Sequence, residues 1–185
     1  VMVPGFWIDK YEVTNAEYAQ FVAATGHSPP EHWKGASPPP GRDDTPVTAI
    51  RYEDAEAYAR WKGKMLPTRE QWMRAFRGDN DWLFPWGDQY EAGRANVGDN
   101  PKFSYTSPVA DTPKDVSLFG VYNLVGNASE FVRGTFEFEG ATWRVGKGSE
   151  YKMSGFRLGI GSNQFLYGLR TVEEGVGFRC VVEEP

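Results

Sequence analysis

Residues 143–180 read WRVGKGSEYKMSGFRLGIGSNQFLYGLRTVEEGVGFRC, and this stretch decides which kind of fold the chain can form. Apolar and aromatic residues return throughout it, but glycine interrupts them every few positions. Glycine disfavours helix interiors and permits turns, bulges and close approach of two backbones. We therefore expect short strands joined by irregular loops, closing on a strand over residues 176–182. The side chains between the glycines either form a display surface or belong to a glycine-rich pair of core strands.

The composition of the whole chain is that of a globular protein. Its 185 residues fit a single domain, residues 1–185, with a substantial core. Hydrophobic residues make up 40% and aromatic residues 15%, which excludes a disordered chain. The net charge of −5 argues against a nucleic-acid partner, which would need a basic face. One cysteine leaves no internal disulfide and no multi-cysteine metal site.

The chain also lacks the signals of a membrane protein. No run of residues is long and apolar enough to span a bilayer, and no signal peptide is visible, so we expect a soluble protein. We see no internal repeat or low-complexity tract that would mark a domain boundary. Residues 143–180 stand out only as a candidate variable, ligand-binding segment of the same domain.

Local signals predict one strand and three helical segments. Residues 6–13 are β-branched and aromatic and predict a strand. A capping box over residues 14–17 begins a helix that ends at Gly26. A second helix is predicted over residues 53–61, and a third follows the capping box of Thr68 and Gln71. The side chains that should face the core are Tyr18, Phe21, Val22, Ala55, Tyr58, Ala59, Trp72, Ala75 and Phe76.

Five motifs in order resemble the formylglycine-generating enzyme (sulfatase-modifying factor) domain. They are FWIDKYEVTNAEYAQF, MLPTREQW, FPWGD, YNLVGNASEF and GVGFRC, and together they cover nearly all of the chain. The resemblance implies an α+β, C-type-lectin-like fold, with two helices packed on small twisted antiparallel sheets and much irregular structure. The family's usual N-terminal segment, with its glycine-rich hairpin, is missing or shortened in this sequence.

The residues required for the family's oxidation chemistry are missing. Enzymes of this family oxidise a substrate cysteine with oxygen and bind copper through two cysteines, and thiolates suit that soft metal. Those two positions align with Met153 and Leu158, neither of which can supply a thiolate. Cys180 belongs to the terminal GFRC pattern, which is structural in the family. We therefore expect no copper, no formylglycine generation and no catalytic residue.

Other relatives of this domain bind ligands instead. The variable proteins of bacterial diversity-generating retroelements use the same fold and diversify the segment that ends in a GFR strand, so this resemblance implies a non-catalytic protein whose partner is an unidentified protein or surface ligand. Two alternatives stay open: an enzyme of the family that does not use the cysteine pair, and a regulatory module of a larger kinase-like protein. The candidate ligand-binding residues are Tyr151, Ser154, Phe156, Ile160, Ser162, Asn163, Phe165 and Tyr167.

The resemblance also implies a structural calcium site. The pattern from Asn123 to Glu130 matches a calcium site of the family, with main-chain carbonyl groups at Gly126 and Ala128 as further ligands. A hard cation prefers such oxygen ligands, and glycine lets the loop turn its carbonyl groups inward. The alternative interpretation is an ordinary Asn-Gly turn followed by a surface glutamate.

Overall fold

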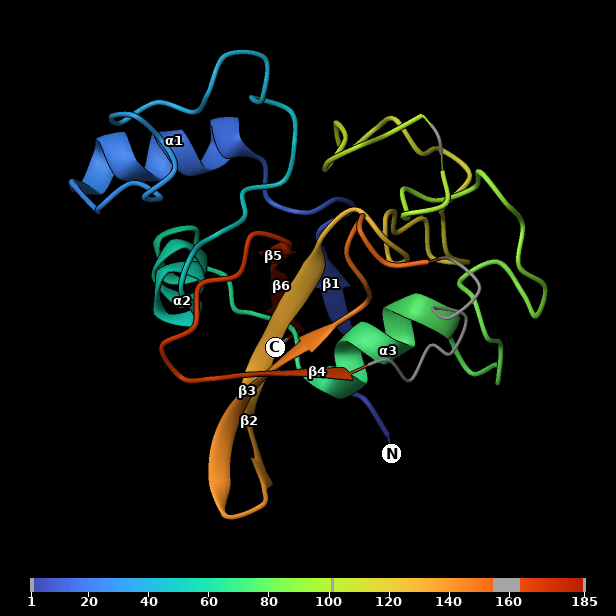
Figure 1. The fold of residues 1–185 in the computed structure, drawn as a ribbon. Coiled ribbons are helices and arrows are strands. Elements are labelled where there is room, and N and C mark those ends of the chain that lie inside the picture. The colour runs from blue at the N-terminus through green and yellow to red at the C-terminus, as the bar shows by residue number, and fades with distance from the viewer. Residues whose placement is uncertain (1, 101, 155–163, 185) are drawn as a thin grey trace.

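The computed structural model describes residues 2–100, 102–154 and 164–184, and its elements follow the order drawn in Figure 1. Three helices precede most of the strands, as in the α+β class that we predicted. The elements are β1 (Phe6–Ile8), α1 (Asn15–Thr25), α2 (Tyr52–Trp61), α3 (Arg69–Arg77), β2 (Ser129–Phe138), β3 (Ala141–Lys147), β4 (Gln164–Tyr167), β5 (Val176–Gly177) and β6 (Val181–Glu183). Among the described residues, no helix has both the length and the apolar character needed to cross a membrane.

The helices begin and bury side chains as the sequence predicts. Thr14 caps α1 and Thr68 caps α3, each through a capping box with the third residue of the helix. Gly26 ends α1 in the left-handed conformation, with φ 70°. All nine side chains predicted to face the core are buried. The described residues therefore form three helical segments, as the local signals indicate, whereas the family resemblance implies two packed helices.

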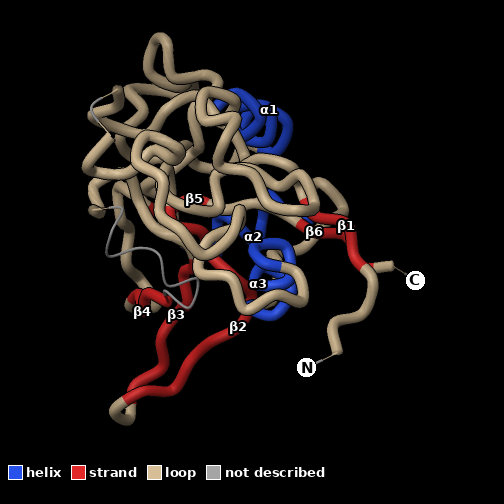
Figure 2. The backbone as a smooth tube through the Cα atoms, turned by 90° about the vertical axis from the view of Figure 1, so that its right-hand side faces the viewer, coloured by secondary structure: helices blue, strands red, loops and turns tan. Residues whose placement is uncertain are grey.

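Two small sheets hold the strands. The larger has the order β4-β3-β2-β5, and the smaller pairs β1 with β6. The β2–β3, β3–β4 and β1–β6 pairs are antiparallel, but the short β2–β5 pair is parallel, which the expectation of antiparallel sheets did not include. The β2–β3 hairpin extends well beyond the rest of the molecule in both views (Figures 1 and 2).

Two of the predicted strands, residues 6–13 and residues 176–182, are shorter than expected. The first keeps only residues 6–8, although Asp9 and Val13 still donate backbone hydrogen bonds to Cys180 and Phe178. The second, predicted over residues 176–182, is split into β5 and β6. The interruption falls at Arg179, whose buried side chain donates to backbone carbonyl groups of other segments. These side-chain bonds supplement the separate backbone bonds of Phe178 and Cys180.

The core consists of two clusters that meet at β2. One surrounds α1 and α2 and includes Phe131, while the other surrounds α3 and includes Val132. Adjacent residues of a strand point to opposite faces, so β2 contributes to both clusters. Glu130, which precedes this pair in β2, is a buried charged residue.

Candidate functional site: a buried ion network and a surface cavity

The last motif of the sequence, GFRC, supplies a fully buried arginine that binds a fully buried glutamate. The guanidinium of Arg179 donates to both carboxylate oxygens of Glu130, from Nε at 2.7 Å and from Nη2 at 2.6 Å. The indole of Trp72 donates to the same carboxylate at 2.9 Å. Bidentate, charge-assisted hydrogen bonds of this kind are strong because the buried charges have no competing water.

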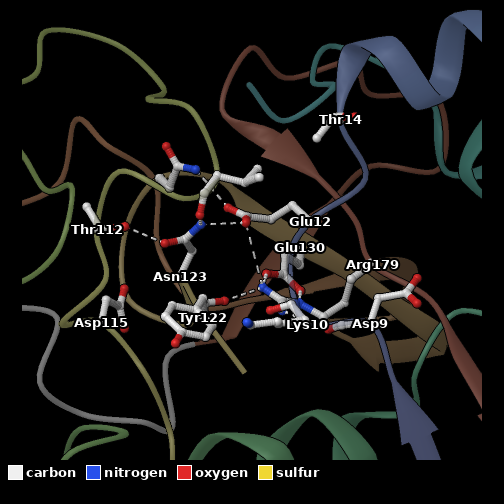
Figure 3. Close-up of polar contacts among 12 residues, drawn as sticks. Asp9, Lys10, Glu12, Thr14, Thr112, Asp115, Tyr122, Asn123, Glu130 and Arg179 are labelled. Carbon is white, nitrogen blue, oxygen red and sulfur yellow. Dashed lines mark hydrogen bonds and ion pairs between the residues drawn. The ribbon is translucent and has the colours of Figure 1, made fainter. Parts of the chain in front are cut away.

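Arg179 also joins segments that are far apart in the sequence (Figure 3). Its Nη1 donates to the carbonyl oxygens of Asp9 at 3.2 Å and Lys10 at 3.1 Å, and its Nη2 donates to the carbonyl of Tyr122 at 2.7 Å. Through these bonds the end of the chain is attached to the segment after β1 and to the loop before β2. A single side chain therefore orders three parts of the molecule.

A second buried carboxyl group, Glu12, lies beside the first. It accepts hydrogen bonds from the side-chain amides of Asn123 at 2.8 Å and Asn127 at 2.9 Å, and its carboxylate is 3.9 Å from Arg179. Burial raises the pKa of Glu12 to about 7, although Arg179 and the amide of Asn123 act in the opposite direction. Burial likewise raises the pKa of the nearby carboxyl group of Asp115 well above its ordinary value.

The arrangement of Asn123 and Glu130 does not fit the predicted calcium ligand set. The side-chain oxygen of Asn123 accepts a hydrogen bond from the hydroxyl of Thr112, while the carboxylate of Glu130 is bound by Arg179 and Trp72. Arg179 already supplies the positive charge that a buried carboxylate requires, so a cation is not needed there. The calcium site stays a prediction, which a calcium titration followed by thermal unfolding would test.

Gly126 is required at its position by close packing. A Cβ atom there would lie 2.1 Å from the backbone oxygen of Asn96, and the residue has φ +79°. Its N–H donates to the hydroxyl of Ser149 at 2.9 Å. The glycine thus brings the loop before β2 against the segment around Asn96, which accounts for its presence without a metal.

A surface cavity of about 220 Å³ opens beside the first candidate ligand-binding residue, Tyr151. Tyr151 is buried, and its ring lies 5.9 Å from the ring of Tyr105, which is 66% exposed. The walls combine these rings with polar side chains of opposite charge and come from segments spread along the chain. They are Asn15, His32, Pro39, Arg42, Pro46, Thr48, Ala49, Tyr105, Thr106, Tyr151 and Glu174.

Hydrogen bonds fix several walls of this cavity. Arg42 donates to the carbonyl oxygen of Thr106 at 3.1 Å and to its hydroxyl at 2.5 Å. The side-chain nitrogen of Asn15 donates to backbone carbonyl groups of residues 42–46, whereas its side-chain oxygen has no partner within the described part of the chain. Burial lowers the pKa of His32, which favours its neutral form. The cavity therefore offers a fixed cation, a buried acceptor and aromatic faces.

Of the other candidate ligand-binding residues, the structure describes three, and two of these, Phe165 and Tyr167, have ring centroids 6.4 Å apart. Ser154 is exposed. Phe165 and Tyr167 lie on β4, where Tyr167 donates to the hydroxyl of Ser129 at 3.2 Å and packs edge-on against Phe131. Tyr167 therefore packs against the core, in addition to any contact that it makes with a ligand. The remaining four candidates, Phe156, Ile160, Ser162 and Asn163, lie outside the described residues, as does Leu158.

The single cysteine is placed where it has no access to a substrate. Cys180 is fully buried, and burial raises the pKa of its thiol far above the ordinary value, so the thiolate is not formed at neutral pH. Met153, which stands at one of the family's cysteine positions, packs against the core cluster around α3.

The fold is shared with C-type-lectin-like proteins of known structure. The structure of PvdO from Pseudomonas aeruginosa has a TM-score of 0.77 and 22% sequence identity, covering 97% of this chain and 80% of that chain. Treponema denticola variable protein 1 has a TM-score of 0.72 and 18% identity, covering 97% and 84%. At these identities the likeness concerns the fold alone.

A family model for the sulfatase-modifying factor enzyme 1-like domain matches residues 1–184, and the chain belongs to this family. An inactive C-alpha-formylglycine-generating enzyme 2 of Mus musculus is 29% identical over 201 residues, which is 82% of this chain and 65% of that protein. The Bacillus subtilis protein YfmG, described as uncharacterized, is 38% identical over 110 residues, or 51% of this chain and 22% of that protein. The chain thus spans less than two thirds of the length of either relative.

Sequence reasoning missed the partners of these buried charges and every lining residue of the cavity except Tyr151. It named Glu130 as a calcium ligand but did not connect it with Arg179, and it did not single out Glu12 or Tyr105. Glu12 and Arg179 each lie between two apolar neighbours. Simple alternation places the middle residue of such a triplet on the exposed face, so the one available signal pointed away from burial.

Proposed function

We propose that this chain is a non-catalytic ligand-binding protein that recognises a protein or surface ligand through the cavity at Tyr105 and Tyr151. The observation that carries the proposal is the cavity itself, because it combines two tyrosine rings with the fixed guanidinium of Arg42 and the buried acceptor of Asn15. Tyrosine gives large contact area at a small cost in side-chain entropy, and concave sites with a few fixed polar groups favour specific binding.

Two further observations support a binding role over catalysis. The thiol chemistry of the enzymes has no counterpart here, since Cys180 is buried and Met153 replaces one family cysteine. The chain also has the fold of Treponema denticola variable protein 1 and, more distantly, of Major Tropism Determinant variants, with a TM-score of 0.59 for the P3c variant. The proposal includes the idea that residues 143–180 are a diversified segment, as in variable proteins of this fold.

A cysteine-independent enzyme is the second candidate, favoured by the raised pKa of buried Glu12. A general base needs a carboxylate oxygen that can reach a substrate proton. Both oxygens of Glu12 instead accept amide hydrogens, from Asn123 and Asn127, and the residue is buried. This geometry suits a structural carboxyl group better than a catalytic one.

Binding can be tested with peptides selected from a phage-displayed random library on the wild-type chain. We expect Tyr105→Ala to weaken the selected peptides by about tenfold or more, because truncating an aromatic anchor typically costs about 2 kcal/mol. Tyr105 is largely exposed, so this substitution leaves the fold intact. The matched control is Phe138→Ala at the distal end of the hairpin, 48% exposed, which should leave the affinity unchanged.

Two outcomes would overturn the proposal. One is a set of peptides whose affinity depends on Phe138 rather than on Tyr105. The other is turnover: oxidation of a cysteine in a sulfatase-derived peptide in the presence of copper, seen as a mass change of that peptide. Diversification is tested separately by sequencing the DNA around the gene for a near-copy of the segment that encodes residues 143–180, beside a reverse transcriptase and differing mainly at adenines.

A further inference from the structure

Arg42, in the wall of the cavity at Tyr151, is a cation without an anionic partner in the described part of the chain. Its guanidinium donates to the carbonyl oxygen and to the hydroxyl of Thr106, and both of these acceptors are neutral. Among the described residues, no carboxylate lies within ion-pair distance of it. A guanidinium has five N–H donors, so the bonds to Thr106 leave further donors unused. Because Arg42 lines the cavity, these donors can bind a group that enters it.

The backbone of Arg42 is held in place by two other residues. Its carbonyl oxygen accepts hydrogen bonds from the side-chain amide of Asn15 at 3.0 Å and from the hydroxyl of Thr45 at 3.0 Å. Asn15 and Thr45 are both buried. Together with the bonds to Thr106, these contacts fix both ends of the arginine. A ligand that binds the guanidinium therefore loses little affinity to the ordering of this side chain.

The other titratable side chains of the cavity do not balance the charge of Arg42. Glu174 is the one acidic residue among the described residues that line the cavity, and its carboxylate accepts a hydrogen bond from the ammonium group of Lys152 at 3.1 Å. Burial and, second, the positive charge of Arg42 lower the pKa of His32 below its ordinary value of 6.5, so His32 is neutral at neutral pH. The cavity therefore has one positive charge that its own walls leave unbalanced.

The size and the chemistry of the cavity favour a small group with a single negative charge. A carboxylate carries one charge and matches the planar fork of a guanidinium, whereas a phosphate monoester carries nearly two charges. The rings of Tyr105 and Tyr151, with centroids 5.9 Å apart, add apolar faces to the same cavity. Its volume of about 220 Å³ lies below the range of about 300–1,000 Å³ that is typical for drug-sized ligands, so it suits one residue of a peptide.

We propose that the cavity recognises a carboxylate of a peptide or protein ligand, which binds the guanidinium of Arg42 while an apolar part of the same ligand packs on Tyr105. This assignment rests on the binding function proposed above and specifies the group that the ligand must carry. The carboxylate is either the C-terminus of a chain or the side chain of an aspartate or glutamate. Both sources offer the same two oxygen atoms to the guanidinium, and the experiment distinguishes them.

The test uses peptides selected on the wild-type chain from a random library that is displayed with free C-termini. Each selected peptide is synthesised in three forms: unchanged, with an amidated C-terminus, and with its acidic side chains replaced by the corresponding amides. We expect one of the altered forms to bind about tenfold more weakly or worse, because a hydrogen bond between charged groups is stronger than one to a neutral group. Loss on amidation assigns the C-terminus, and loss on side-chain replacement assigns aspartate or glutamate.

A protein variant locates the effect at Arg42. In Arg42→Gln the unchanged peptide and its carboxylate-free form should bind within about twofold of each other, because the partner of the carboxylate has been removed. The matched control is Arg94→Gln. Arg94 also donates to a backbone carbonyl of another segment, that of Lys114 at 2.7 Å, but it does not line the cavity, so this variant should keep the tenfold preference. The comparison of peptide forms on the wild type needs no variant, so it tests the carboxylate even if Arg42→Gln does not fold.

Failure of this assignment and failure of the proposed function give different results. Selected peptides that require Tyr105 but bind equally well without any carboxylate would overturn the assignment and leave the binding function of the cavity intact. The same holds if the carboxylate contributes as much to binding in Arg42→Gln as in the wild type. Peptides whose affinity does not depend on Tyr105 would contradict the proposed function itself, and the carboxylate assignment with it.

Discussion

The buried carboxyl group of Glu12 makes the stability of the protein depend on pH. Burial raises the pKa of Glu12 from 4.5 to about 7, so the folded protein retains a proton that the unfolded chain releases. Its contribution to stability is fully present below about pH 4.5 and is lost as the pH rises through 7. Between these values the loss is about 1.4 kcal/mol per pH unit.

Chemical unfolding of the wild type and of Glu12→Gln at a series of pH values measures this effect. The substitution removes one hydrogen-bond acceptor, and this loss lowers the stability of the variant by the same amount at every pH. It therefore does not affect the comparison of the two slopes, which differ because only the wild type has a group that titrates at this position. We therefore expect the wild type to lose stability relative to the variant between pH 5 and 7. Two parallel curves would contradict the assignment.

The neighbours of Glu12 could not have been predicted from the sequence. Its partners are Asn123, Asn127 and Arg179, all more than a hundred positions away, and no local pattern encodes which distant groups meet. The calcium prediction rested on the resemblance of residues 123–130 to a family motif. Asn123 and Glu130 do lie near one another in the network, but each is bound to protein groups that the motif does not reveal.

The pairing of β3 with β4 depends on one glycine. A Cβ atom on Gly146 would lie 2.4 Å from Cε2 of Tyr167 and 3.0 Å from the hydroxyl oxygen of Ser129. Gly146→Ala should therefore displace the tyrosine ring, break its hydrogen bond to Ser129 and cost about 1–3 kcal/mol of unfolding free energy.

A double-mutant cycle with Tyr167→Ala checks this explanation by denaturant unfolding. Once the ring is removed, the added methyl group has space, so Gly146→Ala should cost much less in the Tyr167→Ala background. Additive effects of the two substitutions would show that the glycine acts in another way, for example through the unfolded chain.

Helices were more predictable than strands in this chain, for a physical reason. The capping boxes at Thr14 and Thr68 and the apolar faces of the three helices are encoded within a few residues, and the structure confirms them. The division of residues 176–182 into β5 and β6 depends instead on where the side chain of Arg179 finds its partners. Strand ends are set by such long-range contacts, which a local pattern does not contain.

Removal of the Arg179 side chain should affect the entire fold, because it bonds to three segments that are distant in the sequence. Arg179→Met leaves the buried carboxylate of Glu130 without its positive partner and releases the carbonyl groups of Asp9, Lys10 and Tyr122. We expect a loss of about 3–5 kcal/mol of unfolding free energy, the usual cost of an uncompensated buried charge.

Equilibrium unfolding in urea provides the measurement, with Arg133→Met as the control. Arg133 pairs with Glu183 at the surface, where the two side chains are 35% and 41% exposed. Its loss should cost no more than about 1 kcal/mol. Equal costs for the two arginine substitutions would show that the buried network does not dominate stability.

The antiparallel pairing of β1 with β6 determines how the molecule would respond to mechanical force. Phe6 lies opposite Glu183 and Ile8 opposite Val181, so pulling on the two ends separates the strands one pair at a time, like a zipper, rather than loading all the bonds together. The zipper would open easily as far as Asp9, whose carbonyl group is held by Arg179. At that point the buried ion pair of Arg179 and Glu130 would oppose further separation. The protein would therefore resist stretching at its centre rather than at its ends.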